Sequence, residues 1–361
     1  MVVRLQRSLF EFLKLPEAAP PRRDGGRRKF VDLFSGIGGA SQGATQAGYD
    51  VVLAVDACEH ALQVHKRNHP AARHICTTLP ARFELPLPSE REDWHLHGSP
   101  PCTKLSKANQ ERDEGEREDA LATVRWYLDF ALASSASTWS MEEVASQAIV
   151  ALLERYRAPR AAHRNQVDYL IIKCQEHGLP SMRRRLVAGS PKLIARMRRL
   201  PRVRRSVREV LPQVRGTHLR NEVWWGWNVP LDGPVPATHE VREGARFAYK
   251  RYGPDECCLP IDGLAHCITA RHTLRWATPH TGTPLKLMTA RETAVMQSFP
   301  ATYTLDDNKQ RAIRGLGNAF PPCVAERLFG GTGPPTRPQS PSLRRPAPVP
   351  TWRSAAEEAD G

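Results

Sequence analysis

One segment near the amino end limits the possible folds of this chain more than any other. The apolar run Phe30-Val-Asp-Leu-Phe34 is typical of a short strand, residues 35–39 are rich in glycine, and residues 40–47 can form a helix. A second run of β-branched residues over 51–55 and a helix-like segment over 59–68 follow. Because parallel strands need a crossover between them, this alternation predicts an α/β fold with a doubly wound, mostly parallel sheet.

The alternation continues to about residue 190 and then stops. Leu96-His97 leads into a Pro-Pro turn, residues 121–133 are helix-like, and residues 138–141 are typical of a short strand. Irregular sequence rich in Arg, Trp and Pro then runs to about residue 285 and predicts a second, smaller and loop-rich domain. We therefore expect a basic extension, a main domain in two segments with the smaller domain between them, and a disordered tail rich in Pro, Ser and Arg: 1–29, 30–190 with 310–330, 191–309, and 331–361.

Composition narrows the class of partner. The 361 residues include 52 Lys and Arg against 38 Asp and Glu, a formal net charge of +14. This excess favours a polyanionic partner, nucleic acid ahead of an anionic membrane surface, over a basic protein that is merely soluble. A run of about 18 apolar residues is absent, which excludes a membrane-spanning helix. The eight cysteines form no CxxC pair, so we expect no zinc site and an intracellular location in the cytoplasm, the nucleus or an organelle.

The glycine-rich turn and one later acid indicate a cofactor site. In Asp32-Leu-Phe-Ser-Gly36-Ile-Gly38-Gly39, glycines after a strand let backbone N–H groups approach a ligand at a helix N-terminus. Asp56 ends the second strand 20 residues after Gly36, where an acid can accept hydrogen bonds from ribose hydroxyls. Alone, each glycine fits an ordinary tight turn and Asp56 fits a helix cap. Together they predict a cofactor that contains a nucleoside.

Two further strand ends carry reactive side chains. Cys102 follows the turn Gly98-Ser-Pro-Pro101, whose prolines stiffen the loop that presents one thiol. Glu142 and Glu143 lie at the end of the next strand, where a carboxyl group can protonate or hydrogen-bond a ring nitrogen of a substrate. The alternatives are an inert buried cysteine and two charges at the start of a helix.

Basic residues cluster in two places. Eleven arginines lie in the 33 residues from Arg183 to Arg215, with Glu209 as the one acid, which is typical of a phosphate-binding surface. The second cluster, within residues 22–29, fits a nuclear signal, a phosphate contact or a solvated tail. Three tryptophans downstream can stack on bases or form the core of a small domain: Trp224, Trp225 and Trp227.

In this order, the motifs resemble those of the DNA (cytosine-5) methyltransferase family. The similarity covers about residues 30–328, and seven motifs in one order make it specific. The matching segments are DLFSGIGG (32–39), Asp56 with Asn68-His-Pro70, SPPC (99–102), MEEV (141–144), GLPSMRRR (178–185), Leu287–Glu292 with Met296–Pro300, and Gly317–Pro322.

The resemblance implies a Rossmann-like methyltransferase fold, S-adenosylmethionine as the cofactor, duplex DNA as the substrate, and no metal. It makes Cys102 the nucleophile that adds to carbon 6 of a flipped cytosine, and Glu142 the group that binds and protonates N3. Arg185, and secondarily Arg183, would hold the ring carbonyl or the adjacent phosphate. It makes 30–190 with 310–330 the catalytic domain and 191–309 the target-recognition domain. A restriction nuclease, or a chromatin or viral partner, would be a separate chain. The implied cofactor residues are Asp32, Phe34, Gly36, Gly38, Gly39, Asp56 and Asn318.

The sequence also departs from the family pattern. Thr103 replaces the Gln after the nucleophile, Ser181 replaces the Gln of the arginine motif, and only Thr78 lies near the place of the third-motif Asp. Glu143 replaces an Asn, and its carboxylate is expected to raise the pKa of Glu142 or to add charge beside it. Because Cys102, Glu142 and Arg185 are all present, we expect an active but divergent enzyme.

Two other functions fit the same scaffold. A catalytically inactive protein that binds DNA or regulates is favoured by the departures. A tRNA cytosine-5 methyltransferase would use the same fold, but the Cys-Phe-Thr tripeptide of that branch is absent here.

Overall fold

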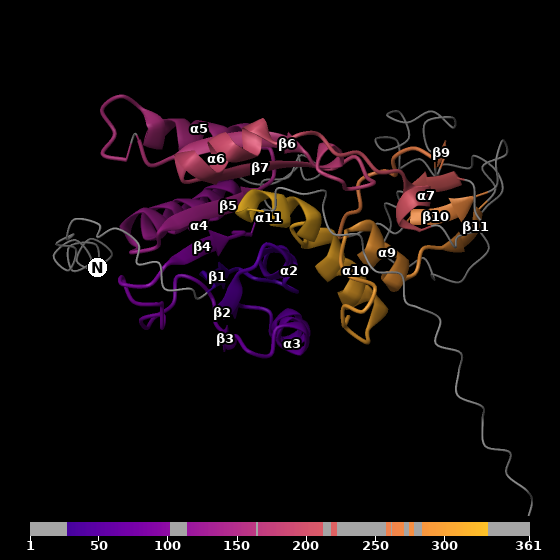
Figure 1. The fold of residues 1–361 in the computed structure, drawn as a ribbon, viewed down its shortest axis with the longest axis horizontal. Coiled ribbons are helices and arrows are strands. Elements are labelled where there is room, and N and C mark those ends of the chain that lie inside the picture. The colour runs from indigo at the N-terminus through magenta and orange to yellow at the C-terminus, as the bar shows by residue number, and fades with distance from the viewer. Residues whose placement is uncertain are drawn as a thin grey trace, which may run out of the picture.

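The computed structural model describes residues 27–101, 114–163, 165–211, 218–221, 258–260, 262–270, 274–277 and 284–330. Two sheets organise these residues (Figure 1). Cys102 and the three tryptophans lie outside the described residues, as do most of the predicted extension and the predicted tail. No helix in the described ranges is both long and apolar enough to cross a membrane.

The larger sheet has seven strands in the order β3-β2-β1-β4-β5-β7-β6. Strands β1 to β5 are parallel to one another, whereas β7 is antiparallel to both β5 and β6. The order reverses direction between β1 and β4, and ligands of wound sheets bind at such a switch point, outside the carboxyl ends of the strands. The bounds are Lys29–Leu33 (β1), Asp50–Asp56 (β2), Arg73–Cys76 (β3), Trp94–Gly98 (β4), Thr138–Glu143 (β5), Asp168–Lys173 (β6) and Arg184–Gly189 (β7).

Helices cover both faces of this sheet, as the alternating pattern predicts. On one face, α4 and α5 pack on a cluster that includes Val31 and Leu33. On the other, α2, α6 and α11 pack on a cluster that includes Phe30. Successive side chains of β1 thus pack against helices on opposite faces of the sheet. The bounds are Gly39–Gln46 (α2), Glu59–Asn68 (α3), Glu114–Ala133 (α4), Gln147–Arg157 (α5), Pro191–Arg199 (α6), Lys309–Asn318 (α10) and Pro322–Phe329 (α11).

The smaller sheet lies at one end of the molecule, and α9 and α10 lie between it and strands β1 to β3 (Figure 1). Its four strands pair in the order β11-β10-β8-β9, and every pair is antiparallel. A separate apolar cluster that includes Val207, Leu274 and Met288 forms its core. The bounds are Val207–Val210 (α7), His218–Asn221 (β8), Cys258–Pro260 (β9), Leu274–Ala277 (β10), Pro284–Leu287 (β11) and Ala290–Met296 (α9).

The last residues of the basic cluster within 22–29 lie at the start of the first strand. Residues 27–29 do not form a free basic tail, because β1 begins at Lys29 and these side chains pair with acids at the edge of the sheet. The guanidinium of Arg28 lies 2.8 Å from a carboxylate oxygen of Asp93, and Lys29 pairs with Glu92. Their charge is therefore partly neutralised within the chain.

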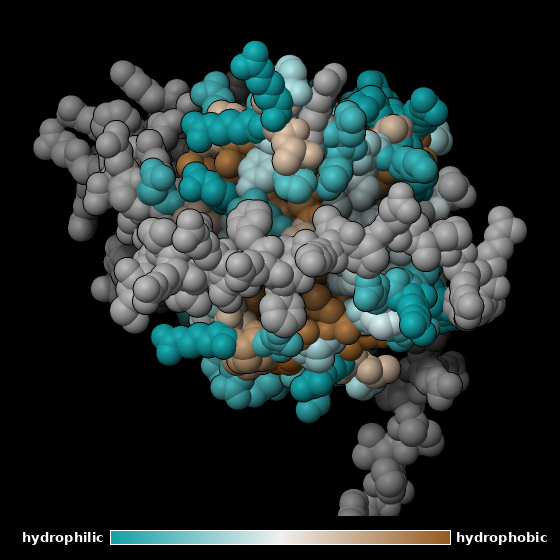
Figure 2. Space-filling model, turned by 90° about the vertical axis from the view of Figure 1, so that its left-hand side faces the viewer, coloured by the Kyte–Doolittle hydropathy of each residue, from teal (hydrophilic) through white to brown (hydrophobic). Residues whose placement is uncertain are grey.

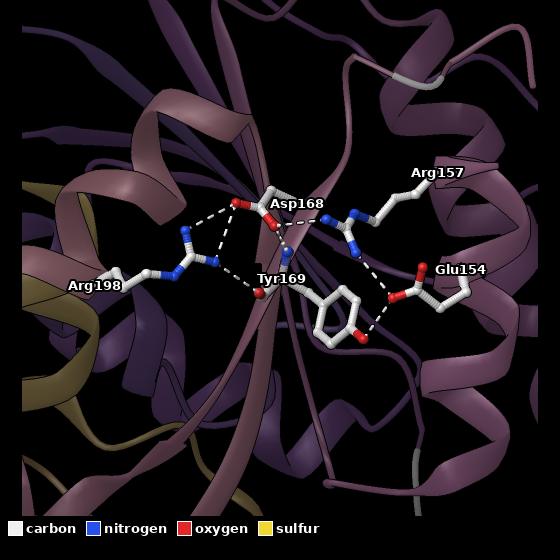
Figure 3. Close-up of polar contacts among 5 residues, drawn as sticks. All are labelled: Glu154, Arg157, Asp168, Tyr169 and Arg198. Carbon is white, nitrogen blue, oxygen red and sulfur yellow. Dashed lines mark hydrogen bonds and ion pairs between the residues drawn. The ribbon is translucent and has the colours of Figure 1, made fainter. Parts of the chain in front are cut away.

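Polar contacts join α5 and α6 across the edge strand β6 (Figure 3). The Asp168 carboxylate lies 3.2 Å from Arg198 of α6 and 3.6 Å from Arg157 of α5. Tyr169 donates a 2.7 Å hydrogen bond to Glu154, which Arg157 also contacts. Half-exposed pairs of this kind contribute little individually, but together they fix both helices beside the edge. On the face that Figure 2 shows, hydrophilic side chains dominate the periphery and hydrophobic surface is visible between them.

Candidate active site

The glycine-rich turn follows β1 at the switch point and takes a shape that side chains oppose. The backbone φ angles of Gly36 and Gly38 are +53° and +92°, in the left-handed region. A Cβ on Gly39 would lie 2.2 Å from the carbonyl oxygen of Phe320, so the turn packs directly on the chain before α11. Around a Cβ on Gly36, by contrast, no atom of the described residues lies within 4 Å. The turn is thus closed toward the core and open at Gly36.

Asp56, at the end of β2, holds this turn. One carboxylate oxygen accepts a 2.7 Å hydrogen bond from the N–H of Gly36, and the other accepts a 2.7 Å bond from the N–H of Cys58. Burial raises the pKa of Asp56, and these backbone donors act in the opposite direction. The acid and the glycine that the sequence places 20 residues apart are therefore in direct contact.

Asp32 lies one layer deeper and is 1% exposed. Its carboxyl group accepts a 2.6 Å hydrogen bond from Ser41 of α2, whose hydroxyl also lies 2.9 Å from Nε2 of His65 in α3. Burial raises the pKa of Asp32 to about 7. The second carboxyl oxygen, Oδ1, is buried without a hydrogen-bond partner in the described part of the chain. Asp32 thus lies in the core next to the glycine turn, where it links β1 to α2 through Ser41.

Two other predicted cofactor residues border the same strand ends. Phe34 has a φ angle of +57° and is half-buried, with its ring edge-on to Trp126 at a centroid distance of 6.2 Å. Asn318 is the exposed last residue of α10. Tyr303 was not predicted from the sequence, although its hydroxyl donates to the carbonyl of Ile37 and would lie 2.7 Å from a Cβ on Gly38. Only tertiary structure brings it to this turn.

Glu142 and Arg185 form an ion pair at the carboxyl end of β5. Nε of Arg185 lies 2.6 Å from Oε1 of Glu142, and Glu142 is 5% exposed. The pair depends on the antiparallel strand β7, whose register sets Glu142 opposite Val187, two residues beyond Arg185. Little water screens charges in such a place, so the guanidinium fixes the orientation of the carboxylate.

Arg183 has different surroundings. It is 1% exposed, and its guanidinium donates to the carbonyl oxygens of Ile268, Gly317 and Ala319 at 2.9–3.0 Å. Ile268 belongs to the core of the smaller region, whereas Gly317 lies in the last turn of α10. Arg183 therefore links its own segment to the two segments that carry these carbonyl groups. Both terminal nitrogens of its guanidinium take part in these bonds.

Glu143 is fully buried beside this pair. Its Oε2 accepts a 2.8 Å hydrogen bond from the N–H of Val144, and Oε1 has no partner among the described residues. Burial, and then the charge of Glu142, raise the pKa of Glu143 well above its usual range. The predicted electrostatic conflict is thus met at Glu143, because burial and the charge of Glu142 both favour the protonated form of its carboxyl group.

The arginine-rich segment is used within the chain more than its density suggests. Besides Arg183 and Arg185, Arg196 donates to carbonyl oxygens of α11, and Arg198 pairs with Asp168. Arg202 and Arg208 pair with Glu176 and Asp262. These pairings leave fewer of the eleven arginines available to bind phosphate than the sequence predicts.

The glycine turn and its strand-end acid lie at the switch point of the sheet, and a buried carboxylate–guanidinium pair lies at the end of β5. This arrangement is typical of α/β enzymes that bind a nucleoside-containing cofactor. The family model for C-5 cytosine-specific DNA methylase matches residues 28–126 and 220–332, more than half of the chain. The chain belongs to this family and is a DNA cytosine-5 methyltransferase.

Individual relatives are distant. The Type II methyltransferase M.HgiDI of Herpetosiphon aurantiacus is 24% identical over 303 residues, which cover 81% of this chain and 90% of the relative. M.XorII of Xanthomonas oryzae pv. oryzae is 22% identical over 358 residues, covering 83% of each chain. The sequence is thus a divergent member.

Solved structures support the fold. A putative DNA modification methyltransferase from an Escherichia coli prophage aligns with a TM-score of 0.55 at 20% identity, covering 84% of this chain and 97% of that one. The Dnmt2 methyltransferase of S. pombe aligns with a TM-score of 0.53 at 16% identity, with the same coverages. Both share the fold of this chain.

Proposed function

We propose that this enzyme methylates carbon 5 of a cytosine flipped out of duplex DNA, with Cys102 as the nucleophile. The buried Glu142–Arg185 pair carries the proposal, because it offers a carboxyl group and a guanidinium side by side at the carboxyl edge of the sheet. A base inside the duplex is out of reach, and flipping it costs about a few kcal/mol. The net charge of +14 favours binding of the phosphate backbone.

The residues of the first turn fit S-adenosylmethionine. The open side of Gly36 leaves room for a ligand beside backbone N–H groups, Phe34 offers an apolar ring, and Asp56 offers carboxylate oxygens for ribose hydroxyls. Asn318, the exposed last residue of α10, offers a side-chain amide for the cofactor. When bound, this cofactor supplies an electrophilic methyl group on a sulfonium.

Cys102 answers the main chemical difficulty, which is that carbon 5 of cytosine is a poor nucleophile. Addition of a thiolate to carbon 6 forms an S–C bond and breaks the 5,6 double bond, so that electron density moves to carbon 5 and the ring nitrogen. Glu142 holds a proton at N3, where negative charge develops. After methylation, loss of the carbon-5 proton and expulsion of the thiolate restore the double bond.

The two arginines have separate tasks in this proposal. Arg185 orients Glu142 and donates to the ring carbonyl or the adjacent phosphate. Arg183 is a positioning residue, because its donors hold the segments that carry Ile268, Gly317 and Ala319. Burial favours the neutral form of Glu143, and the guanidinium of Arg185 pairs with Glu142.

Transfer of labelled methyl groups from S-adenosylmethionine to mixed-sequence duplex DNA tests the proposal, and conversion sequencing of the product identifies the target. Label should appear on DNA with the wild type and with Cys76→Ser, a matched control at an exposed cysteine. It should disappear with Cys102→Ser. Cofactor binding without transfer to DNA would refute the proposal and favour the inactive scaffold, and transfer to tRNA alone would favour the RNA enzyme.

A further inference from the structure

Two exposed cysteines lie at the carboxyl edge of the larger sheet, beside the acid that holds the glycine turn. Cys76 is the last residue of β3, and Cys58 follows the end of β2 by two residues and is the N-cap of α3. Both thiols are free, and the side chain of Cys58 makes no capping hydrogen bond. The methyl transfer proposed above uses neither sulfur.

The sheet brings these two cysteines together. Strands β2 and β3 are parallel neighbours, and their register sets Asp56 opposite Cys76. The thiol of Cys76 donates a weak hydrogen bond to the carbonyl oxygen of Ala57, with Sγ 3.8 Å from that oxygen. Because Ala57 directly precedes Cys58, Sγ of Cys76 lies no more than about 7 Å from Cα of Cys58. Rotation of the side chains can close a separation of this size.

The orientation of β3 directs Cys76 toward the amino end of α3. Side chains two positions apart in a strand lie on the same face, so Cys76 shares its face with His74. His74 contacts α3, because its Nε2 lies 2.9 Å from Nδ1 of His65. The helix packs on β2 and β3 (Figure 1), and its amino end is the end that Cys58 caps. The two sulfurs therefore lie on the same side of the sheet.

A bond between the two sulfurs would act on Asp56. The N–H of Cys58 donates a 2.7 Å hydrogen bond to Oδ1 of Asp56, whose Oδ2 accepts a bond from Gly36. The N–H of Thr77, which follows Cys76, donates to the backbone carbonyl of Asp56. Both cysteines are thus joined, directly or through a neighbour, to the acid that offers its oxygens to ribose. A disulfide would draw Cys58 toward β3 and disturb a donor that orients this acid.

We propose that Cys58 and Cys76 form a dithiol site that hydrogen peroxide oxidises to a disulfide, and that this disulfide weakens the binding of S-adenosylmethionine. The effect on the cofactor rests on the proposed function, whereas the disulfide rests on the positions of the two thiols alone. Disulfides in reducing compartments are usually transient and often sense redox state, and redox-sensing cysteines are typically exposed and next to a second thiol.

The oxidation takes place in two balanced steps. The thiolate of one cysteine attacks an oxygen of the peroxide, so that an S–O bond forms and the O–O bond breaks; the hydroxide that leaves takes up the thiol proton and becomes water. The second thiolate attacks the sulfenic sulfur, which forms the S–S bond and expels hydroxide, and this takes up the second proton. Two thiols and one hydrogen peroxide give one disulfide and two waters, and two electrons pass from sulfur to oxygen.

Peptide mass spectrometry of the full chain tests the site. Trypsin separates the two cysteines, because Lys66, Arg67 and Arg73 lie between them. Protein treated with hydrogen peroxide, alkylated and digested should yield a linked peptide pair that contains Cys58 and Cys76, and dithiothreitol should separate it. Recovery of both cysteines as alkylated thiols, or as singly oxidised sulfurs without a link, would overturn the proposal. This outcome is independent of cofactor and DNA.

The affinity for S-adenosylmethionine, measured by calorimetry, tests the consequence. We expect the Kd of the wild type to rise about tenfold or more after peroxide treatment and to return to its first value after dithiothreitol. Cys58→Ser and Cys76→Ser should keep the Kd of the reduced protein after the same treatment, because neither variant can form the bond. Cys267→Ser is the matched control at a half-buried cysteine, and its Kd should rise as that of the wild type does.

The possible results separate this proposal from the proposed function. An unchanged Kd in protein that carries the Cys58–Cys76 link would overturn the proposal, and so would an equal rise of the Kd in Cys58→Ser, which would place the effect at another residue. If the link forms but the reduced wild type does not bind S-adenosylmethionine at all, the dithiol site stands and the proposed function is overturned instead.

Discussion

The buried contacts of Arg183 give a sharp prediction. Arg183→Leu removes the donor to three carbonyl oxygens, of which those of Ile268 and Gly317 are buried and that of Ala319 is partly buried. An unsatisfied buried group costs about 1–3 kcal/mol, so the two buried ones correspond to about 2–6 kcal/mol. We expect the lower part of this range, because the leucine side chain regains some apolar burial.

Arg184→Leu, at an exposed neighbouring position, is the matched control for this prediction. The side chain of Arg184 lies outside the core, so its effect on stability should be within about 0.5 kcal/mol. Urea unfolding, followed by circular dichroism, measures both variants. The expected result is a loss of at least about 2 kcal/mol for Arg183→Leu, and near-native stability for Arg184→Leu. Native stability of Arg183→Leu would refute the positioning role.

Three further outcomes follow from buried groups and the glycine turn. The pKa of Asp32 is about 7 in the folded protein, above its unfolded value, so its contribution to stability is present at low pH and lost as pH rises toward and through 7. Asp32→Asn should therefore flatten the urea midpoint between about pH 4 and pH 8 relative to the wild type. Glu143→Gln keeps the neutral form of the side chain and should retain activity at neutral pH, whereas a loss like that of Glu142→Gln would contradict a protonated Glu143. Gly39→Ala should destabilise more than Gly36→Ala in thermal unfolding, because its Cβ would meet Phe320 at 2.2 Å whereas the space at Gly36 is open; equal melting temperatures would contradict this packing.

Local patterns predicted the parallel part of the fold closely. The helix expected over 59–68 has these bounds, and the strand expected over 51–55 extends by one residue at each end. Such elements are set by short-range periodicity and by turn chemistry. The helix expected over 121–133 begins earlier, at Glu114. The first turns of α4 are rich in polar residues, so they lack the helical periodicity of apolar residues that identifies its later part.

The sequence predicted which residues form the candidate site, but it did not predict the contacts between them. The spacing of 20 residues placed Asp56 near Gly36, and the carboxylate of Asp56 accepts a hydrogen bond from the N–H of Gly36. The Glu142–Arg185 pair needs the antiparallel register of β7, which no local pattern encodes. For the same reason the burial of Arg183 was not predicted, since it depends on partners far along the chain.

Identification of the residue that joins covalently to the target base tests the central claim most directly. The wild-type protein would be incubated with S-adenosylmethionine and duplex DNA containing 5-fluorocytosine, and the denatured adduct would be digested and analysed by mass spectrometry. The account predicts one modified cytosine on the peptide that contains Cys102, and no adduct with Cys102→Ser. A methylated cytosine product without any adduct at Cys102, or an adduct at another residue, would contradict it.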